Sequence, residues 1–326
     1  RGAVNSSLKA GSSATRTDRI LMAPFLLKRI FHGVVVLWVV ATLTFVLLRL
    51  TPGGPFDRER KLPPQVIANL AAKYHLEESL FEQYLRYLTG IVRGDLGPSY
   101  KYLDRGVNEI VRDTLPTSAL LGAFAIAFAL AVSIPIGLFA AYRRGSWIDR
   151  WLMISASIGI SVPHFILGAV LIWALALQLN WFNAGRWDTF SSAILPTITL
   201  GAAPAAYLSA LLRSSLVDTL GEDFIRTARA KGITEAGVLF KHALSQSVIP
   251  MLTVMGPLTA TLLTGSFVVE YVFAIPGMGR FFITAVTDRD YPLIMGVTLI
   301  YTAILVSANL LVDLLYGFVD PRIRSQ

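Results

Sequence analysis

The 326-residue sequence has no cysteine and few charged residues. The lack of cysteine excludes disulfides, thiolate metal sites and cysteine nucleophiles. Charged residues make up 15% of the chain, below the roughly 25% that is typical of soluble domains. They stand between long runs that contain almost none, and 54% of all residues are hydrophobic. This composition indicates an integral membrane protein.

Several functional motifs are also absent. No Walker-type glycine-rich loop occurs, so this chain is not expected to bind ATP in that manner. An intramembrane enzyme is disfavoured, because there is no His-Glu-x-x-His motif, no mid-span aspartate pair and no Gly-x-Ser-x-Gly motif with a nearby histidine. No Asp or Glu lies in the middle of an apolar run, which argues against a self-sufficient secondary transporter.

Six apolar runs are long enough to cross a bilayer, because about 20 helical residues span a core of about 30 Å. Lipid offers no partners for backbone polar groups, so the predicted fold is all-α, with six transmembrane helices. Prolines inside these runs predict kinks, which serve either packing or hinge motion. The predicted spans are 30–48, 117–142, 151–177, 194–212, 248–269 and 292–311.

The distribution of Lys and Arg predicts the orientation of the chain. Six spans place both termini on one side, which carries sixteen basic residues. The short loops of the other side carry only Arg186, Arg280 and Arg289. The positive-inside rule therefore places both termini in the cytoplasm. The net charge of +8 follows from the same residues, so no nucleic-acid partner is predicted.

The predicted organisation has four parts. Residues 1–22 are expected to be a disordered tail, a targeting remnant or an expression-derived segment, and 23–50 to hold the first span. Residues 51–116 carry nine basic and nine acidic residues and are predicted to form an external helical cap. Two amphipathic helices are expected in it, at 65–74 and 80–92, the second with Leu80, Tyr84, Leu85 and Leu88 on one face. Residues 117–326 are the predicted core, with five spans.

The segment 222–244 is a basic connector between the fourth and fifth apolar runs. Asp223 complements the start of a short helix predicted over 224–231. Gly232 is expected to follow it in the left-handed conformation, and Thr234 to cap the next helix. Apolar side chains on this connector either rest on the membrane surface or fill a groove on a soluble protein.

The string Arg226-Thr-Ala-Arg-Ala-Lys-Gly232 resembles the coupling motif of permease subunits of binding-protein-dependent ABC importers. His242-Ala-Leu244 and Ile249-Pro250 are similar to the continuation of that motif. Arg226 stands where the broad motif has Glu, and the closing proline comes late, as is usual in the oligopeptide/dipeptide subfamily. Further resemblances to this subfamily, and most closely to the B-type subunit of oligopeptide systems, lie in Thr51-Pro-Gly-Gly-Pro55, Gly94-Asp-Leu-Gly97, Gly97-Pro-Ser-Tyr-Lys101, Ile275-Pro-Gly-Met-Gly279 and Arg289-Asp-Tyr291.

The resemblance implies a type I importer permease in the bacterial cytoplasmic membrane. It implies a second homologous permease, two cytoplasmic ABC ATPase subunits and an extracytoplasmic peptide-binding protein as partners. ATP and Mg would be used by the ATPase subunits, with no cofactor and no metal bound by this chain. The implied cargo is oligopeptides, with dipeptides, nickel or another small cargo as alternatives.

Two sets of residues carry the predicted function. The fifth apolar run supplies candidates for lining the translocation pathway, namely Thr261, Thr264 and Ser266, although threonines in such helices often bond only their own backbone. The predicted ATPase-coupling residues are Arg226, Thr227, Ala228, Arg229, Lys231, Gly232, Glu235, Ala236, Val238 and Phe240.

Overall fold

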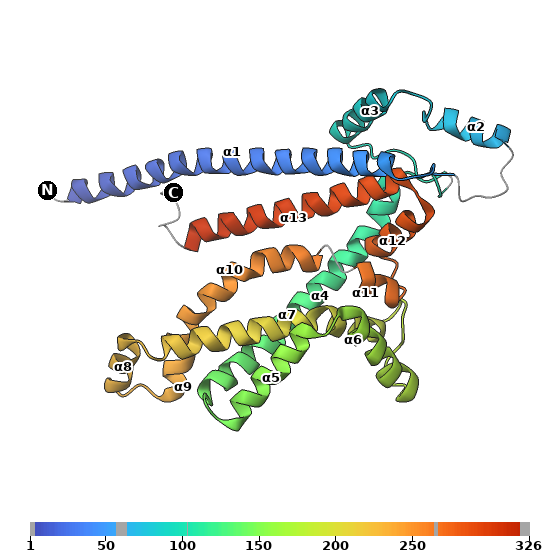
Figure 1. Ribbon diagram of the computed structural model, residues 1–326. Helices are drawn as coiled ribbons and strands as arrows, with labels where there is room; N and C mark the ends of the chain where they lie inside the picture. Colours follow the sequence, from blue (N-terminus) through green and yellow to red (C-terminus); the bar gives the residue numbers. More distant parts are fainter. Residues whose placement is uncertain (1–3, 57–63, 103, 264–266, 320–326) are drawn as a thin grey trace.

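The computed structural model describes residues 4–56, 64–102, 104–263 and 267–319, and these are almost entirely helical (Figure 1). No β-sheet is present in those ranges. The α-helices are α1 (Val4–Leu50), α2 (Pro64–Lys73), α3 (Leu80–Arg93), α4 (Val107–Tyr142), α5 (Trp147–Ser161), α6 (His164–Leu171), α7 (Phe190–Thr219), α8 (Asp223–Ala230), α9 (Glu235–Gly237), α10 (Leu244–Leu263), α11 (Phe267–Val272), α12 (Met278–Asp288) and α13 (Tyr291–Val319). Two π-helices, η1 (Ile172–Gln178) and η2 (Val238–Ala243), follow α6 and α9.

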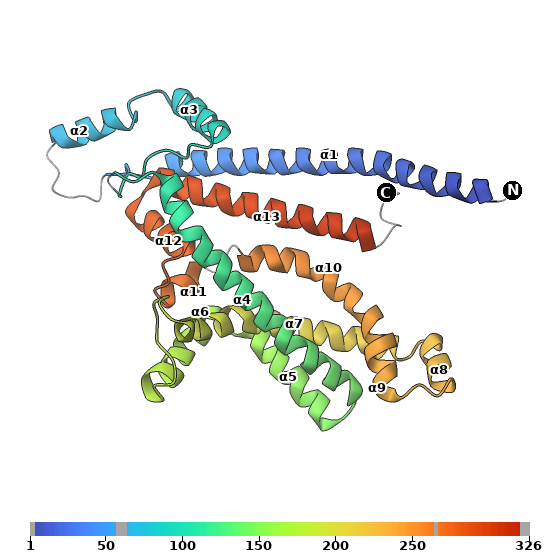
Figure 2. The same ribbon diagram turned by 180° about the vertical axis from the view of Figure 1, so that it is seen from behind.

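The long helices run between two distinct ends of the molecule. Helices α1 and α13 lie side by side in both views, and α4 crosses the bundle towards α7 (Figures 1 and 2). Helices α2 and α3 lie at one end, whereas α8 and α9 lie at the other, together with the start of α1 and the end of α13 (Figures 1 and 2). This arrangement agrees with an even number of membrane crossings.

Five helical stretches of the described chain have the length and apolar character of a membrane span. They are Leu27–Leu50, Val107–Tyr142, Phe190–Thr219, Glu235–Val272 and Tyr291–Leu311. The bent pair Trp147–Ser161 and His164–Gln178 supplies a sixth if it crosses once. The predicted all-α membrane fold is therefore confirmed, with five spans, or the predicted six if the bent pair crosses once.

The third predicted span, 151–177, is wrong in its middle because the helix breaks there. Helices α5 and α6 meet at an angle of 104°. Pro163 has no N–H to donate, and it holds the preceding residue away from helical geometry. Val162 accordingly has φ −76° and ψ 121°. Pro163, which was expected to kink one helix, instead separates two helices, α5 and α6.

Two helix starts also differ from the sequence predictions. Helix α4 begins at Val107 rather than 117, so the first turns of α4 lie within the segment predicted as the cap. Helix α1 begins at Val4, and residues 4–22, predicted to be a disordered tail, are helical. Extending an existing helix adds one hydrogen bond for each residue that is fixed, which favours both extensions.

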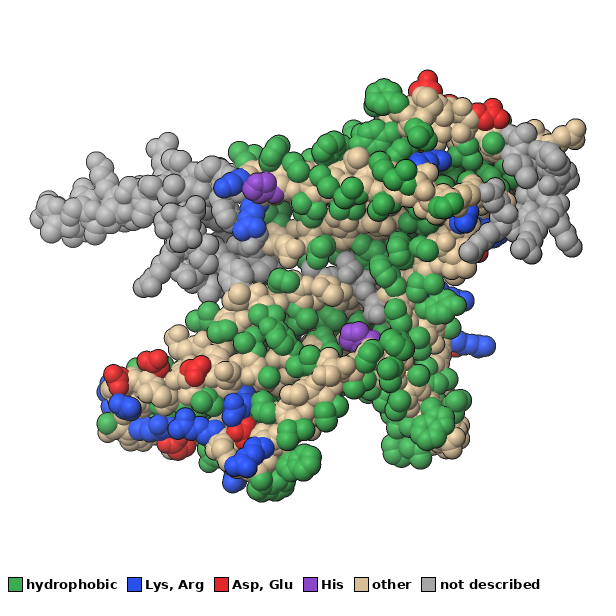
Figure 3. Space-filling view, in the orientation of Figure 1, with side chains coloured by type: hydrophobic (Ala, Val, Ile, Leu, Met, Phe, Trp, Pro, Cys, Tyr) green, Lys and Arg blue, Asp and Glu red, His purple; other side chains and the backbone are tan. Residues whose placement is uncertain are grey.

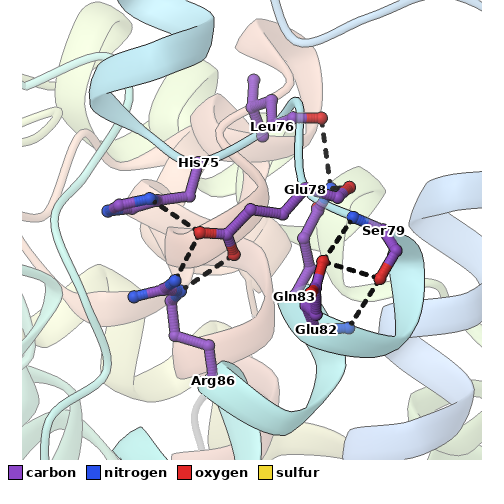
Figure 4. Close-up of polar contacts among 7 residues, drawn as sticks. All are labelled: His75, Leu76, Glu78, Ser79, Glu82, Gln83 and Arg86. Carbon is purple, nitrogen blue, oxygen red and sulfur yellow. Dashed lines mark hydrogen bonds and ion pairs between the residues drawn. The ribbon is translucent and has the colours of Figure 1, made fainter.

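The cap helix α3 is held by a local polar network (Figure 4). Ser79 and Glu82 form a capping box, in which the Glu82 amide donates to Ser79 Oγ at 3.3 Å and the Ser79 amide to Glu82 Oε2 at 2.9 Å. Gln83 Nε2 donates to the Glu78 carbonyl at 2.8 Å. The Arg86 guanidinium hydrogen-bonds the Glu78 side chain and lowers the pKa of that carboxyl. The predicted helix 80–92 is thus confirmed with a specific start.

Asp290 fastens the loop after α3 to the start of α13. Ser99 Oγ donates to Asp290 Oδ2, and the amides of Tyr100 and Lys101 donate to the same carboxylate at 3.1 and 3.3 Å. The Leu293 amide donates to Asp290 Oδ1 at 3.3 Å. The Asp290 side chain is buried, so the Ser99 hydroxyl and the Tyr100 and Leu293 amides depend on it for a partner, whereas the Lys101 amide also donates to Ser99 Oγ at 3.2 Å.

Glu270 performs a similar task at the break between α11 and α12. The Gly279 amide donates to Glu270 Oε2 at 2.8 Å, and the Met278 amide donates to Ser118 Oγ of α4 at 2.9 Å. Glu270 and Ser118 are both fully buried. The loop packs so closely that a Cβ at Gly277 would lie 2.2 Å from Glu270 Oε2 and 2.7 Å from Ser118 Oγ.

We predict that Gly277→Ala destabilises the protein, because the added methyl group displaces a buried, hydrogen-bonded carboxylate. Overpacking of this kind costs about 1–3 kcal/mol. The matched control is Gly106→Ala, where the nearest atom to a new Cβ is 4.0 Å away. Thermal unfolding in detergent should show a lower midpoint for Gly277→Ala only. Equal midpoints for the two variants would contradict the packing described here.

We predict that Asp290→Ala loosens the loop that carries Tyr100. Each buried donor left without an acceptor costs about 1–3 kcal/mol. Hydrogen exchange at the Tyr100 amide should therefore accelerate by roughly tenfold or more. The control is Asp95→Ala, which removes only the bond from the Gly97 amide at 2.9 Å. Unchanged exchange at Tyr100 in Asp290→Ala would show that the clamp is not needed.

Candidate coupling site

The connector between α7 and α10 folds as the sequence predicts, into a short helix, a glycine bend and a second helical segment. Helix α8 (Asp223–Ala230) agrees with the predicted helix 224–231 within one residue. Asp223 lies in its first turn and Arg229 in its last, where each charge complements the helix dipole. We call the segment from Asp223 to Ala243 the elbow.

Gly232 makes the bend of the elbow. Its φ is +77°, in the left-handed region, as the sequence predicts. The Gly232 amide donates to the Arg229 carbonyl at 2.9 Å, and the Ile233 amide to the Ala228 carbonyl at 3.3 Å. These bonds satisfy carbonyls at the end of α8, as in a helix C-terminal motif. A Cβ on Gly232 would meet nothing within 4 Å, so the constraint on this position is backbone conformation alone.

The second half of the elbow starts with the predicted cap. Thr234 Oγ1 accepts the Gly237 amide at 3.3 Å. Across the bend, Arg229 donates twice to the Glu235 carboxylate, at 2.8 and 3.2 Å. Both side chains are exposed, so the pair is worth about 0–1 kcal/mol. The sequence did not indicate this pair, because its six-residue spacing is not a helical one.

The predicted coupling residues divide into two groups by burial. Ala228 and Val238 are buried within the protein, so they lie beneath the exposed face of the elbow, and their role in coupling stays a prediction. They join Ile225, Leu239 and Ala243 in one apolar cluster with residues of α4, α7 and α10. This outcome follows from amphipathicity, since the elbow must bury one face on its own bundle. The exposed coupling residues are Arg226, Thr227, Arg229, Lys231, Gly232, Glu235, Ala236 and Phe240.

The exposed face of the elbow combines charge with apolar surface. Phe240 is 60% exposed, and Phe224, which the sequence reading did not single out, is 44% exposed. Phe240 and Ala236 border an apolar groove of about 570 Å³ that also includes Phe139 and Tyr142 at the end of α4. Figure 3 shows Lys, Arg, Asp and Glu side chains gathered at this end of the molecule. Such a surface suits contact with a soluble protein.

The elbow is connected mechanically to two membrane helices. The π-helix η2 runs directly into α10, so the second half of the elbow and the fifth span form one continuous helical segment. Ser247 Oγ of α10 donates to Thr219 Oγ1 at the end of α7, at 2.9 Å. The elbow is therefore joined to both α7 and α10.

A buried ion pair braces the same end of the bundle. Arg213 of α7 donates to both oxygens of Asp149 in α5, at 2.6 and 2.7 Å. The Gly145 amide donates to Asp149 Oδ2 at 2.9 Å. Asp149 is buried, so removing either partner would leave an uncompensated charge. Arg213 and Asp149 are 64 residues apart in sequence, and their pairing carries no local sequence signal.

The predicted pathway residues are only partly described. Thr261 is exposed on α10, and its Oγ1 donates to the Pro257 carbonyl at 2.9 Å. Thr264 and Ser266 lie outside the described residues. A role for these three positions in the pathway therefore stays a prediction. Within the described part of the chain, no group of three or more His, Asp or Glu side chains has the arrangement of a metal site.

Comparison with known proteins matches nearly the whole chain. Residues 133–325 match the family described as "Binding-protein-dependent transport system inner membrane component", and residues 22–122 match its N-terminal companion family. A solved chain titled as an amino acid ABC transporter has 18% identity and a TM-score of 0.49, and covers 64% of this chain and 92% of its own length.

Several relatives are similar over almost their full length. The dipeptide transport system permease protein DppB of Bacillus subtilis (strain 168) is 44% identical over 303 residues, covering 93% of this chain and 98% of DppB. The oligopeptide transport system permease protein OppB of Haemophilus influenzae is 39% identical, covering 93% of this chain and all of OppB. OppB of Escherichia coli (strain K12) is 37% identical over 305 residues, with the same coverage of both chains. By these matches the chain belongs to the family of binding-protein-dependent transport system inner membrane components.

Proposed function

We propose that this chain is the permease subunit of an ATP-driven peptide importer in the bacterial cytoplasmic membrane. Its partners would be a second homologous permease, two cytoplasmic ABC ATPase subunits and an extracytoplasmic peptide-binding protein. The observation that carries the proposal is the elbow, a bent two-helix connector that is continuous with α10 and exposes Ala236 and Phe240. Family membership supports the same conclusion.

Peptides are the proposed cargo because the similar relatives are named for them. The relatives bear the names of both dipeptide and oligopeptide systems. Identity to the Bacillus subtilis dipeptide permease, 44%, exceeds the 39% identity to the Haemophilus influenzae oligopeptide permease. We propose oligopeptides because the segment Gly97-Pro-Ser-Tyr-Lys101 resembles oligopeptide systems most closely, with dipeptides as the alternative that this identity favours.

The elbow end is proposed to face the cytoplasm. Sixteen of the Lys and Arg residues lie in segments on this side, as counted from the sequence. The start of α1 and the end of α13 lie at the same end (Figures 1 and 2). Both termini would then be cytoplasmic, and α2 and α3 would lie outside the cell.

The proposed mechanism is mechanical. The exposed face of the elbow, including Arg226, Lys231, Ala236 and Phe240, would occupy a groove on an ATPase subunit. Closure of the ATPase dimer on ATP would displace the elbow, and the buried side chains Ile225 and Val238 would pass that displacement to the helices beneath. The fourth and fifth spans, α7 and α10, would then tilt between inward- and outward-facing states.

The transport reaction itself tests the proposal. Liposomes that carry this chain, the second permease and the ATPase subunits should take up a labelled pentapeptide only with binding protein outside and ATP and Mg²⁺ at the ATPase side. Competition by unlabelled dipeptide measures the size preference. Uptake by this chain alone, or uptake that does not depend on ATP, would overturn the proposal.

We predict that Gly232→Val impairs coupling, because a β-branched residue resists the left-handed conformation by about 1–2 kcal/mol. A penalty of that size reduces the bent population roughly 5–30-fold. ATP-dependent peptide uptake should fall accordingly, while membrane insertion, measured by immunoblot, stays near wild type.

The matched control is Gly232→Asn, because asparagine tolerates the left-handed region. A new side chain has open space here, so a loss in Val but not Asn reports backbone conformation alone. Normal uptake by Gly232→Val would refute the role of the bend.

A further inference from the structure

Helix α3 presents three different faces, and one of them is apolar and uncovered. Phe81 is 68% exposed, Leu85 47% and Val92 87%. These residues recur at intervals of four and seven, so they form one stripe along the helix. The helical pattern predicts Tyr84 and Leu85 on one face, but the structure separates them. Tyr84 packs against α1, whereas Leu85 points away from the protein.

The packed face places α3 beside the outer half of a membrane span. Tyr84 Oη lies 2.7 Å from Thr42 Oγ1 of α1, and the rings of Tyr84 and Tyr87 lie 5.3 and 6.1 Å from that of Phe45. Thr42 precedes Leu50, the end of α1, by about 12 Å along the helix axis. Helix α3 therefore lies beside α1, and the contact is nearer the middle of the span than Leu50 is (Figure 1).

The surface of α1 at that level is itself apolar and exposed. Leu43, Val46 and Leu47 are each more than 40% exposed. Since α1 is a membrane span, its outward side chains at this depth face lipid or another membrane helix. Helix α3, which carries the apolar stripe, packs on α1 at this same level.

The third face of α3 is polar. Arg86 and Arg93 lie on it with Thr89 and the exposed Glu82. Arg86 is paired with Glu78 of the preceding turn. Arg86 and Arg93 are both exposed. A helix with one apolar face and cations beside it is typical of the membrane–water interface. Tyr84 and Tyr87 add the aromatic side chains that are enriched at that boundary.

We propose that α3 is an interfacial helix that binds phospholipids of the outer leaflet. Phe81, Leu85 and Val92 contact acyl chains, and Arg86 and Arg93 lie at the phosphate-bearing headgroups. The depth of the contact with Thr42 and the exposed apolar side chains of α1 at that level favour lipid over a soluble partner. The inference rests on the chain crossing a membrane and, for the choice of leaflet, on the proposed orientation, and it does not depend on the cargo.

The absence of cysteine in the sequence makes the proposal directly testable, since single-cysteine variants label without background. Spin labels are placed at Leu85→Cys and Val92→Cys on the stripe. The matched controls are their neighbours, Arg86→Cys and Arg93→Cys. The full-length chain, with the subunits that co-purify, is reconstituted into phosphatidylethanolamine–phosphatidylglycerol nanodiscs. Paramagnetic resonance then measures collisions with oxygen, which concentrates among acyl chains, and with a water-soluble nickel chelate.

The oxygen-to-nickel collision ratio should be several-fold higher at positions 85 and 92 than at positions 86 and 93. Equal ratios, with free access of the nickel chelate to all four labels, would show that the stripe faces water. Low collision rates with both reagents and immobilised spectra at 85 and 92 would show that a protein covers it. Either of these results overturns the proposal. All four positions are exposed or at the helix surface, and the pair Phe81→Cys and Thr89→Cys repeats the comparison if one variant fails to fold.

Discussion

The structure depends on one constraint: a helix that breaks in or beside a membrane must find new partners for its backbone N–H and C=O groups. This chain breaks its helices repeatedly, and buried side chains repair the breaks. Asp290 receives amides from the cap loop and from the start of α13. Glu270 and Ser118 receive those of the loop before α12. Polar residues that are rare in an apolar sequence thus occur where the backbone needs them.

The elbow solves the same problem with a glycine instead of a buried carboxylate. Its amides and carbonyls pair locally through the left-handed turn at Gly232, so no side chain from the bundle is needed there. The bend consequently remains on the surface, while Ile225 and Val238 hold it to the bundle. Exposure and attachment are both required of a segment that transmits force from a soluble partner.

Much of this arrangement could be predicted from the sequence because it follows from local rules. Apolar run length gives the spans, and the cap and bend residues Thr234 and Gly232 give the elbow. Two kinds of feature could not be predicted. Long-range pairs such as Asp149 with Arg213 bring together residues whose separation in sequence has no periodic signature. The inward direction of Ala228 and Val238 depends on which side of the elbow meets the bundle, and a short helix with apolar residues on several sides does not reveal that.

The elbow itself and the outer loops differ in how firmly their polar contacts hold, although the buried pair of Asp149 with Arg213 braces the bundle beside the elbow. At the cap end, the carboxylates of Asp290 and Glu270 are buried, and a donor deprived of such an acceptor costs about 1–3 kcal/mol. At the elbow, the pairs of Arg226 with Asp223 and of Arg229 with Glu235 are exposed and contribute about 0–1 kcal/mol each. A partner can therefore exchange the surface contacts of the elbow at little cost, whereas the outer loops resist the same disturbance. Rearrangement driven from the elbow would then act on the tilt of α7 and α10 before it reaches the clamped outer loops.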